Sequence, residues 1–383
     1  MPAPLTLAIT VLAYFVLYGP QPLLPRLADA FGVTESQTAL LMTATLLPLG
    51  VAPIAYGAVL ARVSSRQVLI VGVGALGLAT ILFALAEAFT VLLALRLAQG
   101  LVLPAVLTAM MTALSERTQP RRMQRVMSAY IASTILGGLG GRLLSGAFAT
   151  YLDWTAFFIA TGAALLLTLP FLWRVPAAPA GAARDISAAS IVAVWLRHGN
   201  WRIYAGIFCL FFVFVGLLNF LPFRVRTLHP GASEFLIGLV YSGYVMGIVA
   251  ALAANRVIAV LGSTRRALAS GYVLYVAALV PALIPHLPTL FASVFLFCLG
   301  MFLVHAIASA TVNETAGEQR GMVNGLYVSA YYTGGVLGSY LPGLVYEGGG
   351  WTATIAVLGL VGLVGLGLTT SYRDRPAHGP PGQ

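Results

Sequence analysis

Apolar segments long enough to cross a membrane recur along the whole chain, and no other feature constrains its fold as strongly. A helix needs about 20 residues to cross a hydrocarbon core about 30 Å thick. The chain is 59% hydrophobic and only 8% charged, and the segments lack the polar–apolar alternation of membrane β-strands. We therefore expect an all-α integral membrane protein with twelve transmembrane helices, near residues 5–27, 38–60, 68–87, 90–114, 125–149, 152–173, 202–223, 235–259, 267–285, 289–312, 321–346 and 351–371.

The basic residues predict how these helices are oriented. All 21 are arginine, and their placement in alternate loops argues against a nucleic-acid surface. With a cytoplasmic N-terminus, sixteen lie in cytoplasmic segments, two lie within helices, and three lie outside, namely Arg26, Arg224 and Arg226. Because cytoplasmic loops carry the excess of basic residues, both termini are expected in the cytoplasm. The first segment lacks a basic leader and is too long for a signal peptide, so we expect it to remain as the first helix.

One long polar break divides the helices six and six. We expect an N-terminal six-helix bundle over residues 1–174, a cytoplasmic linker over 175–201, a C-terminal six-helix bundle over 202–372 and a cytoplasmic tail over 373–383. The linker carries residues that fit a short interfacial helix, a disordered linker being the alternative. These residues are Arg184, Ile186, Ile191, Val194, Trp195 and Arg197.

The two halves repeat each other in sequence. At a shift of 197 residues, ten of the 31 positions in 126–156 are identical to their counterparts in 323–353. The chain is therefore expected to contain two six-helix pseudo-repeats in the same orientation. Transporters built in this way bind their substrate between the halves, near the middle of the membrane.

Motifs within helices resemble the major facilitator superfamily over nearly the full length of the chain. LLALRLAQGLVLPA, at residues 92–105, is similar to the fourth-helix pattern of that family, with Arg96, Gln99 and Gly100 at the matching positions. GGLGGRLLSG, at residues 137–146, is similar to its antiporter motif but lacks the proline. The chain most resembles the YNFM-like branch, often grouped with drug-efflux carriers. The resemblance implies the fold of this superfamily and a monomeric secondary carrier that works by alternating access.

One loop resembles the signature between the second and third helices of the same family. The segment GAVLARVSSRQV begins at residue 57, and Gly57, Arg62 and Arg66 match the signature. Its acid is replaced by Ala61 and its second glycine by Ser64. The resemblance implies a gating role for the three matching residues, and the two departures put the cytoplasmic latch of that motif in doubt.

Two arginines are expected inside the membrane. Counted from the helix ends at about 1.5 Å per residue, Arg96 and Arg142 lie roughly 9 and 10 Å below the outer surface, in one layer. All eleven acidic residues fall near helix ends, and Glu87 is the nearest candidate counter-ion and coupling residue. Because an unpaired buried charge is costly, we expect a cavity of positive potential that binds an anionic or polar substrate through Arg142 and Arg96.

Structural roles are the alternatives for both arginines. Arg96, also a candidate coupling residue, could instead bond the backbone of the first helix, where Gly19, Pro20 and Pro22 free carbonyl groups. Arg142 could pair with Glu87 or extend to the membrane surface. The repeat favours a functional role for Arg142, since a serine, Ser339, occupies the equivalent position in the second half.

Polar side chains on other helices are expected to complete the substrate site. Tyr18 and Gln21 share one face of the first helix, and Asn219 lies in the seventh. Tyr332 precedes Ser339 by seven residues and so shares its face, with Tyr331 beside it. The alternative for these tyrosines is ordinary aromatic packing.

His305 is the histidine expected deepest in a membrane helix, the tenth. Histidine titrates near neutral pH and suits a proton-coupling role. The alternative is a hydrogen-bonded contact between helices.

These observations predict a secondary active transporter, proton-coupled and exporting a small anionic, polar or amphipathic organic compound. A proton-independent organic-anion uniporter or exchanger is one alternative, and a transport-dead membrane receptor is another. No ATP-binding, metal-binding or catalytic motif is present, so we expect neither an enzyme nor a cofactor or metal. The partners are a small-molecule substrate, possible protons and the lipid bilayer, without nucleic acid. The expected location is a cell membrane of the bacterial inner-membrane type.

Overall fold

The computed structural model describes residues 3–60, 63–115, 118, 120–173, 188–196, 199–314 and 320–372, and in this part of the chain the regular secondary structure is helical. The first half contains α1 (Ala3–Tyr18), the 3₁₀ turn η1 (Gln21–Leu23), α2 (Leu24–Phe31), α3 (Glu35–Leu60), α4 (Ser65–Ala84), α5 (Phe89–Ser115), α6 (Pro120–Tyr151), α7 (Trp154–Leu167) and α8 (Leu169–Trp173). The second half contains α9 (Ala188–Leu196), α10 (Trp201–Leu228), α11 (Glu234–Val240), η3 (Tyr241–Val245), α12 (Met246–Leu261), α13 (Thr264–Ala277), η4 (Pro281–Leu283), α14 (Leu287–Glu314) and α15 (Arg320–Thr370).

Ten of the described segments are long and apolar enough to cross a membrane. Two features bear on the expected twelve. The last of the ten segments covers most of α15, and α15 consists of two helices that meet at Gly350, where the backbone is left-handed (φ 67°, ψ −166°). The 26-residue helix α3 is not one of the ten segments. The number twelve and the cytoplasmic termini stay predictions.

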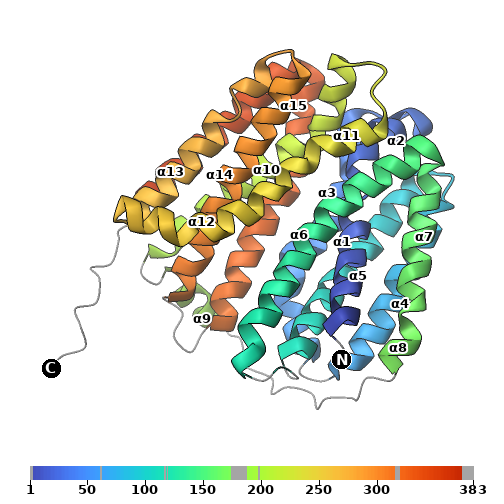
Figure 1. The fold of residues 1–383 in the computed structure, drawn as a ribbon, viewed down its shortest axis with the longest axis horizontal. Helices are drawn as coiled ribbons and strands as arrows, with labels where there is room; N and C mark the ends of the chain where they lie inside the picture. Colours follow the sequence, from blue (N-terminus) through green and yellow to red (C-terminus); the bar gives the residue numbers. More distant parts are fainter. Residues whose placement is uncertain are drawn as a thin grey trace.

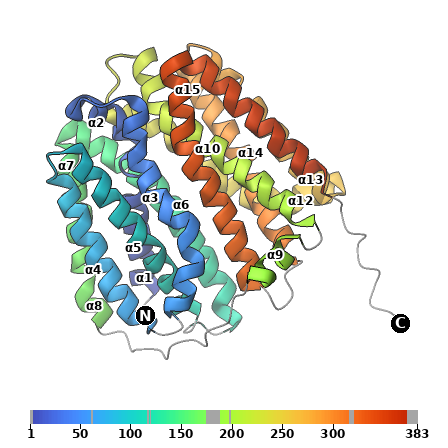
Figure 2. The ribbon, with the colours of Figure 1, turned by 180° about the vertical axis from the view of Figure 1, so that it is seen from behind.

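The two halves of the chain form two helical bundles that lie side by side (Figures 1 and 2). The bundles meet along two main seams, where α3 packs on α15 and α6 packs on α11. Glycines at equivalent repeat positions allow both contacts. A Cβ atom on Gly146 of α6 would collide with the backbone of Glu234, and one on Gly343 of α15 would lie 2.8 Å from the Cβ of Ser36. Residues 146 and 343 are 197 positions apart, so the repeat predicted from sequence places both close approaches.

The upper end of the molecule in Figure 1, where α1 turns into α2, is held shut across both seams. Ser36 at the start of α3 donates from its hydroxyl to Glu347 of α15 at 2.6 Å. On the other seam, the backbone N–H of Phe235 at the start of α11 donates to the Thr150 hydroxyl of α6 at 3.0 Å. Thr150 and Glu347 are again 197 positions apart. Each half therefore supplies an acceptor to the first turn of a helix in the other half.

Ion pairs lie at the rim, and two of them, Arg26–Glu234 and Arg226–Asp29, join the two halves. Arg26 lies 3.3 Å from Glu234 and 3.5 Å from Asp153, and Arg226 lies 2.7 Å from Asp29. The Asp153 carboxylate accepts hydrogen bonds from the side chain and backbone of Thr155, and these bonds, with the nearby Arg26 charge, lower its pKa. Asp153 is therefore ionised at neutral pH. All these side chains are partly exposed, and exposed ion pairs contribute only about 0–1 kcal/mol each.

A short helix lies within the region expected to be the linker. It is α9, where Val194 is buried and Trp195 packs 5.0 Å, centroid to centroid, from Tyr204 of α10. Arg184, Ile186 and Arg197, which the sequence also assigned to an interfacial helix, lie outside the described residues. The described part of this region is thus helical and docked on the C-terminal bundle.

Candidate functional site

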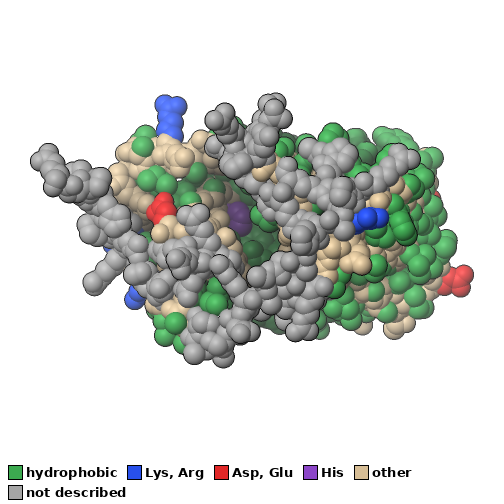
Figure 3. Space-filling model, turned by 90° about the horizontal axis from the view of Figure 1, so that it is seen from below, with side chains coloured by type: hydrophobic (Ala, Val, Ile, Leu, Met, Phe, Trp, Pro, Cys, Tyr) green, Lys and Arg blue, Asp and Glu red, His purple; other side chains and the backbone are tan. Residues whose placement is uncertain are grey.

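A cavity of about 230 Å³ lies between the two bundles. Seen from below, the molecule is hollowed, and hydrophobic side chains and a histidine are visible within the hollow (Figure 3). Six tyrosines dominate its wall, and none of the described lining residues is acidic. The lining consists of Tyr14, Tyr18, Thr134, Ile135, Gly138, Phe214, Tyr244, Phe302, His305, Tyr327, Val328, Tyr331 and Tyr332.

Arg142 stands between this cavity and the closed upper end. Along α6, Thr134 and Gly138 line the cavity, Arg142 follows one turn later, and Gly146 and Thr150 form the seam above. At 1.5 Å per residue, Arg142 lies about 6 Å above Gly138. Its side chain has no exposed surface. Arg142 is therefore positioned at the inner end of the cavity, behind the residues that line it.

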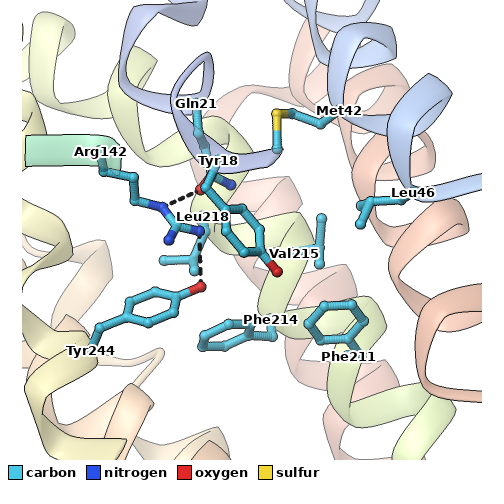
Figure 4. Close-up of a pocket in the computed structure, with 10 residues that line it drawn as sticks. All are labelled: Tyr18, Gln21, Met42, Leu46, Arg142, Phe211, Phe214, Val215, Leu218 and Tyr244. Atoms are coloured by element: carbon cyan, nitrogen blue, oxygen red, sulfur yellow. Dashed lines mark hydrogen bonds between the residues drawn. The ribbon is translucent and has the colours of Figure 1, made fainter. Parts of the chain in front are cut away.

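The Arg142 guanidinium holds partners from both bundles (Figure 4). Its Nε donates to Gln21 Oε1 at 2.6 Å, and its Nη2 donates to the Tyr244 hydroxyl at 2.9 Å, while Nη1 donates to the Gly138 carbonyl at 2.7 Å. Gln21 belongs to the first half of the chain and Tyr244 to the second. A guanidinium carries five N–H groups, and these bonds use three of them.

Aromatic rings surround the same charge. The Arg142 Cζ atom lies 4.1 Å from the ring centroid of Tyr18, 4.3 Å from that of Tyr244 and 5.0 Å from that of Tyr241. Ring faces attract a cation, so the tyrosines stabilise the buried charge without neutralising it. Among the described residues Arg142 has no carboxylate partner, and a void of about 10 Å³ lies beside it.

A chain of hydrogen bonds extends from Arg142 across the boundary between the halves. Gln21 Nε2 donates to Asn219 Oδ1 at 2.6 Å, and Asn219 Nδ2 donates to the Ser339 carbonyl at 3.4 Å. The Ser339 hydroxyl in turn lies 2.5 Å from the hydroxyl of Thr43 on α3. The Gln21–Asn219 and Thr43–Ser339 links each join one bundle to the other, so opening the upper end would separate these partners.

His305 occupies another part of the cavity wall. Its Nδ1 lies 3.0 Å from the Tyr327 hydroxyl, which also donates to the His305 carbonyl at 3.2 Å. If the hydroxyl proton goes to the carbonyl, Nδ1 supplies the proton of the shorter bond and Nε2 keeps a lone pair. The Tyr331 ring packs 5.0 Å from the imidazole. In that tautomer, His305 Nε2 can accept a hydrogen bond from a cavity occupant.

Arg96 lies within the N-terminal bundle and does not line this cavity. Its guanidinium donates to the carbonyls of Val16 at 2.8 Å, Leu17 at 2.9 Å and Leu41 at 3.0 Å, and to Gln99 Oε1 at 2.8 Å. The Val16 carbonyl is free because residue 20, four positions later, is a proline without an N–H. The structure thus gives Arg96 the backbone-bonding arrangement that was its alternative, and it does not place Arg96 where a substrate would bind.

The other expected site residues separate into groups. Tyr18, Tyr331 and Tyr332 line the cavity, as His305 does, and Gln21 binds Arg142 directly. Asn219 is buried one hydrogen bond further away. Glu87, by contrast, is exposed and forms no ion pair with a described residue, so the structure brings it to neither arginine and we leave it out of the site.

The expected gating residues lie on another part of the molecule. Gly57 belongs to α3, near its end. Arg66 lies in the first turn of α4, on a surface groove that Trp173 also lines. Arg62 lies outside the described residues. The latch role of this segment is therefore still an expectation.

Sequence reasoning missed Tyr244 and Tyr241, two of the three rings around Arg142. They lie in η3, the 3₁₀ turn between α11 and α12. A spacing of three residues between tyrosines inside an apolar span was an available signal, because such residues share a helical face. Nothing in the sequence indicated which residue of the other half that face would meet.

Two helical bundles that enclose a cavity, with buried polar links across their boundary, are the arrangement of a membrane carrier. A family model described as Major Facilitator Superfamily matches residues 6–261 and 227–383. The chain therefore belongs to the major facilitator superfamily, and it is a multi-pass transporter of the cell membrane.

Relatives in sequence agree with this assignment. The chain is 26% identical over 367 residues to the inner membrane transport protein YnfM of Escherichia coli (strain K12), covering 94% of this chain and 88% of that protein. It is 22% identical over 363 residues to the uncharacterized MFS-type transporter YybF of Bacillus subtilis (strain 168), covering 93% and 89%.

Solved structures share the fold. A bacterial homologue of the human lysosomal transporter Spinster, in an inward-facing and unoccupied conformation, matches with a TM-score of 0.79 at 14% identity, covering 96% of this chain and 95% of that one. The inward-facing and occupied conformation matches with a TM-score of 0.73 at 15% identity, covering 96% and 92%. At these identities the likeness concerns the fold alone.

Proposed function

We propose that this protein is a proton-coupled secondary transporter that exports a small organic anion by alternating access. The observation that carries the proposal is Arg142, a fully buried guanidinium at the inner end of a cavity without acidic lining among the described residues. A positive site with no built-in counter-charge favours an anionic ligand, because an unpaired buried charge is costly. Cationic compounds fit such a site poorly.

The conformation described here is the inward-facing one in this proposal, with twelve transmembrane helices and both termini in the cytoplasm. Two observations support it. The upper end is closed by the Ser36–Glu347 and Phe235–Thr150 contacts, and the opposite face is hollowed (Figure 3). The Spinster homologue with the higher TM-score is likewise inward-facing. Export then requires the polar links around Arg142 to separate.

His305 carries the proton in this mechanism. It lines the same cavity as the substrate site, and its Nε2 is left as an acceptor when Tyr327 holds Nδ1. Replacing it by glutamine should abolish the dependence of transport on the pH gradient. An unchanged pH profile in His305→Gln would remove this residue from the mechanism and favour proton-independent anion exchange.

The test of the proposal starts with ligand binding to purified protein. Organic acids, sugars and cationic dyes are compared by thermal shift, since a ligand that binds the folded state raises its apparent stability. The stabilising compounds are then assayed for flux in proteoliposomes with an imposed pH gradient. We expect organic anions to bind and to be transported, whereas stabilisation by cationic dyes alone would contradict the proposal.

A matched pair of variants assigns the site. Arg142→Ala should insert and fold but lose flux. Arg256→Ala removes the same charge from an exposed position on α12 and should transport normally. Undiminished flux in Arg142→Ala would refute the site.

A further inference from the structure

We infer that the substrate is a single-ring aromatic monocarboxylate, whose carboxylate displaces the Tyr244 hydroxyl from Arg142. This inference rests on the proposed function and names the substrate class of the same cavity. It combines three independent features of the site, namely the character of the walls, the volume of the cavity and the bonds of the guanidinium.

The walls of the cavity favour a planar aromatic group. Tyrosine and phenylalanine rings reach it from α1, α10, η3, α14 and α15. Rings prefer offset or edge-to-face partners with centroids about 4.5–7 Å apart. The walls already pair in this way, with the Tyr331 centroid 5.2 Å from that of Tyr332 and the Tyr244 centroid 5.6 Å from that of Phe302, both pairs edge to face.

The volume limits the size of the occupant. A dry cavity of about 150 Å³ accepts benzene, and this cavity measures about 230 Å³. One ring with a short carboxylate chain fits that space. Sites for multi-ring compounds of drug size measure about 300–1,000 Å³, so the smaller cavity, which opens on the lower face (Figure 3), favours a single-ring occupant.

The bonds of Arg142 explain how a carboxylate reaches a charge that has no exposed surface. Tyr244 belongs both to the cavity wall and to the guanidinium, through its 2.9 Å bond to Nη2. The neighbouring void of about 10 Å³ has room for about one water-sized atom. A carboxylate must therefore take the place of the hydroxyl. An ionised acceptor makes the stronger hydrogen bond to guanidinium, which favours the exchange.

This exchange would also change the closure of the upper end. The Arg142–Tyr244 bond joins the two halves, and the carboxylate would replace it with a bond to a small molecule. One of the links that hold the inward-facing state is thereby removed when substrate binds.

The experiment compares four probes that differ by one feature each. Purified full-length protein is titrated with 3-phenylpropanoate, with 3-cyclohexylpropanoate (no aromatic ring), with 3-phenylpropan-1-ol (no charge) and with 3-phenylpropylamine (opposite charge). Binding is measured by thermal shift and calorimetry. We expect 3-phenylpropanoate to bind at least tenfold more tightly than each of the other three.

Two variants test the exchange at Arg142. Tyr244→Phe keeps the ring and removes the competing hydroxyl, so 3-phenylpropanoate should bind a few-fold more tightly. Arg142→Gln should weaken binding at least tenfold. If Arg142→Gln does not fold, Tyr244→Phe still tests the inference. Tenfold weaker binding of 3-phenylpropanoate to Tyr244→Phe than to wild type would show that the carboxylate does not displace the Tyr244 hydroxyl.

The outcomes distinguish a failure of this inference from a failure of the proposed function. Equal binding of the cyclohexyl and phenyl acids would overturn the aromatic class and leave an organic-anion carrier in place. Equal or tighter binding of the alcohol or the amine would overturn both. An aliphatic dicarboxylate that binds more tightly than every aromatic acid would overturn only the substrate class.

Discussion

Arg96 and Arg142 are both fully buried arginines within the membrane layer, yet they lie in opposite kinds of environment. Arg96 donates to carbonyls and an amide of its own bundle. Arg142 donates to an amide of one bundle and a phenol of the other, and stands at the end of a cavity. The first arrangement is independent of how the bundles are placed, whereas the second changes whenever they move apart.

The comparison shows that burial of a charge does not identify a functional site. A backbone carbonyl freed by a proline is a fixed acceptor, and a guanidinium that satisfies several of them holds one fold together. A guanidinium with side-chain partners from a second, mobile unit can exchange them for a ligand. Which partners a buried charge has, and on which rigid body they lie, therefore determines its role.

The largest predicted difference between substitutions of Arg96 and Arg142 is in the stability of the folded protein. Arg96→Met leaves the carbonyls of Val16 and Leu17, at the end of α1, without the guanidinium donor, and each unsatisfied buried group costs about 1–3 kcal/mol. Arg142→Met should cost less, since the Gly138 carbonyl lies inside α6 and also accepts a backbone N–H. Thermal unfolding in detergent should show a larger decrease in Tm for Arg96→Met. Equal decreases would remove the distinction between the two arginines.

A smaller effect is expected on the equilibrium between conformations. Gln21→Leu removes both the oxygen that accepts from Arg142 and the N–H group that donates to Asn219. A hydrogen bond to a charged group contributes about 1.5–3 kcal/mol, so the outward-open fraction should increase at least about tenfold. Pulsed electron spin resonance between labels at Leu152 and Gly231, with Cys209 and Cys298 replaced by serine, measures the opening.

Gln99→Leu is the matched control for this change. It makes the same substitution beside Arg96, where Gln99 Oε1 accepts from Nη1 at 2.8 Å within one bundle. It should lower Tm and leave the distance between the labels unchanged. A shift of that distance in Gln99→Leu would mean that Arg96 also contributes to the opening.

The smallest effect is expected at the rim. Asp29→Asn breaks the 2.7 Å ion pair with Arg226, but both side chains are largely exposed. Such a pair contributes about 0–1 kcal/mol and is screened by salt. The outward-open fraction should change by less than about fivefold at 0.15 M salt, and by less at 1 M. A larger change would mean that the rim charges, rather than the buried links of Arg142, hold the upper end closed.

The candidate site was only partly predictable from sequence. Arg142, Tyr18, Gln21, Tyr332 and His305 could be found because polar residues in apolar helices are few. Glu87 was assigned as a counter-ion because it was the nearest acid by depth. Glu87 lies between the end of α4 at Ala84 and the start of α5 at Phe89, where the structure leaves its carboxylate exposed.

The sequence alone determined the helical membrane class, the twofold repeat and the family, because apolar length, internal identity and short motifs are local or periodic properties of a chain. It also marked both buried arginines. Only the tertiary structure decided that Arg96 bonds the broken first helix while Arg142 meets Tyr244 across the boundary. That difference depends on how α6 and η3 rotate and approach each other, and the packing of the two bundles against each other sets this geometry.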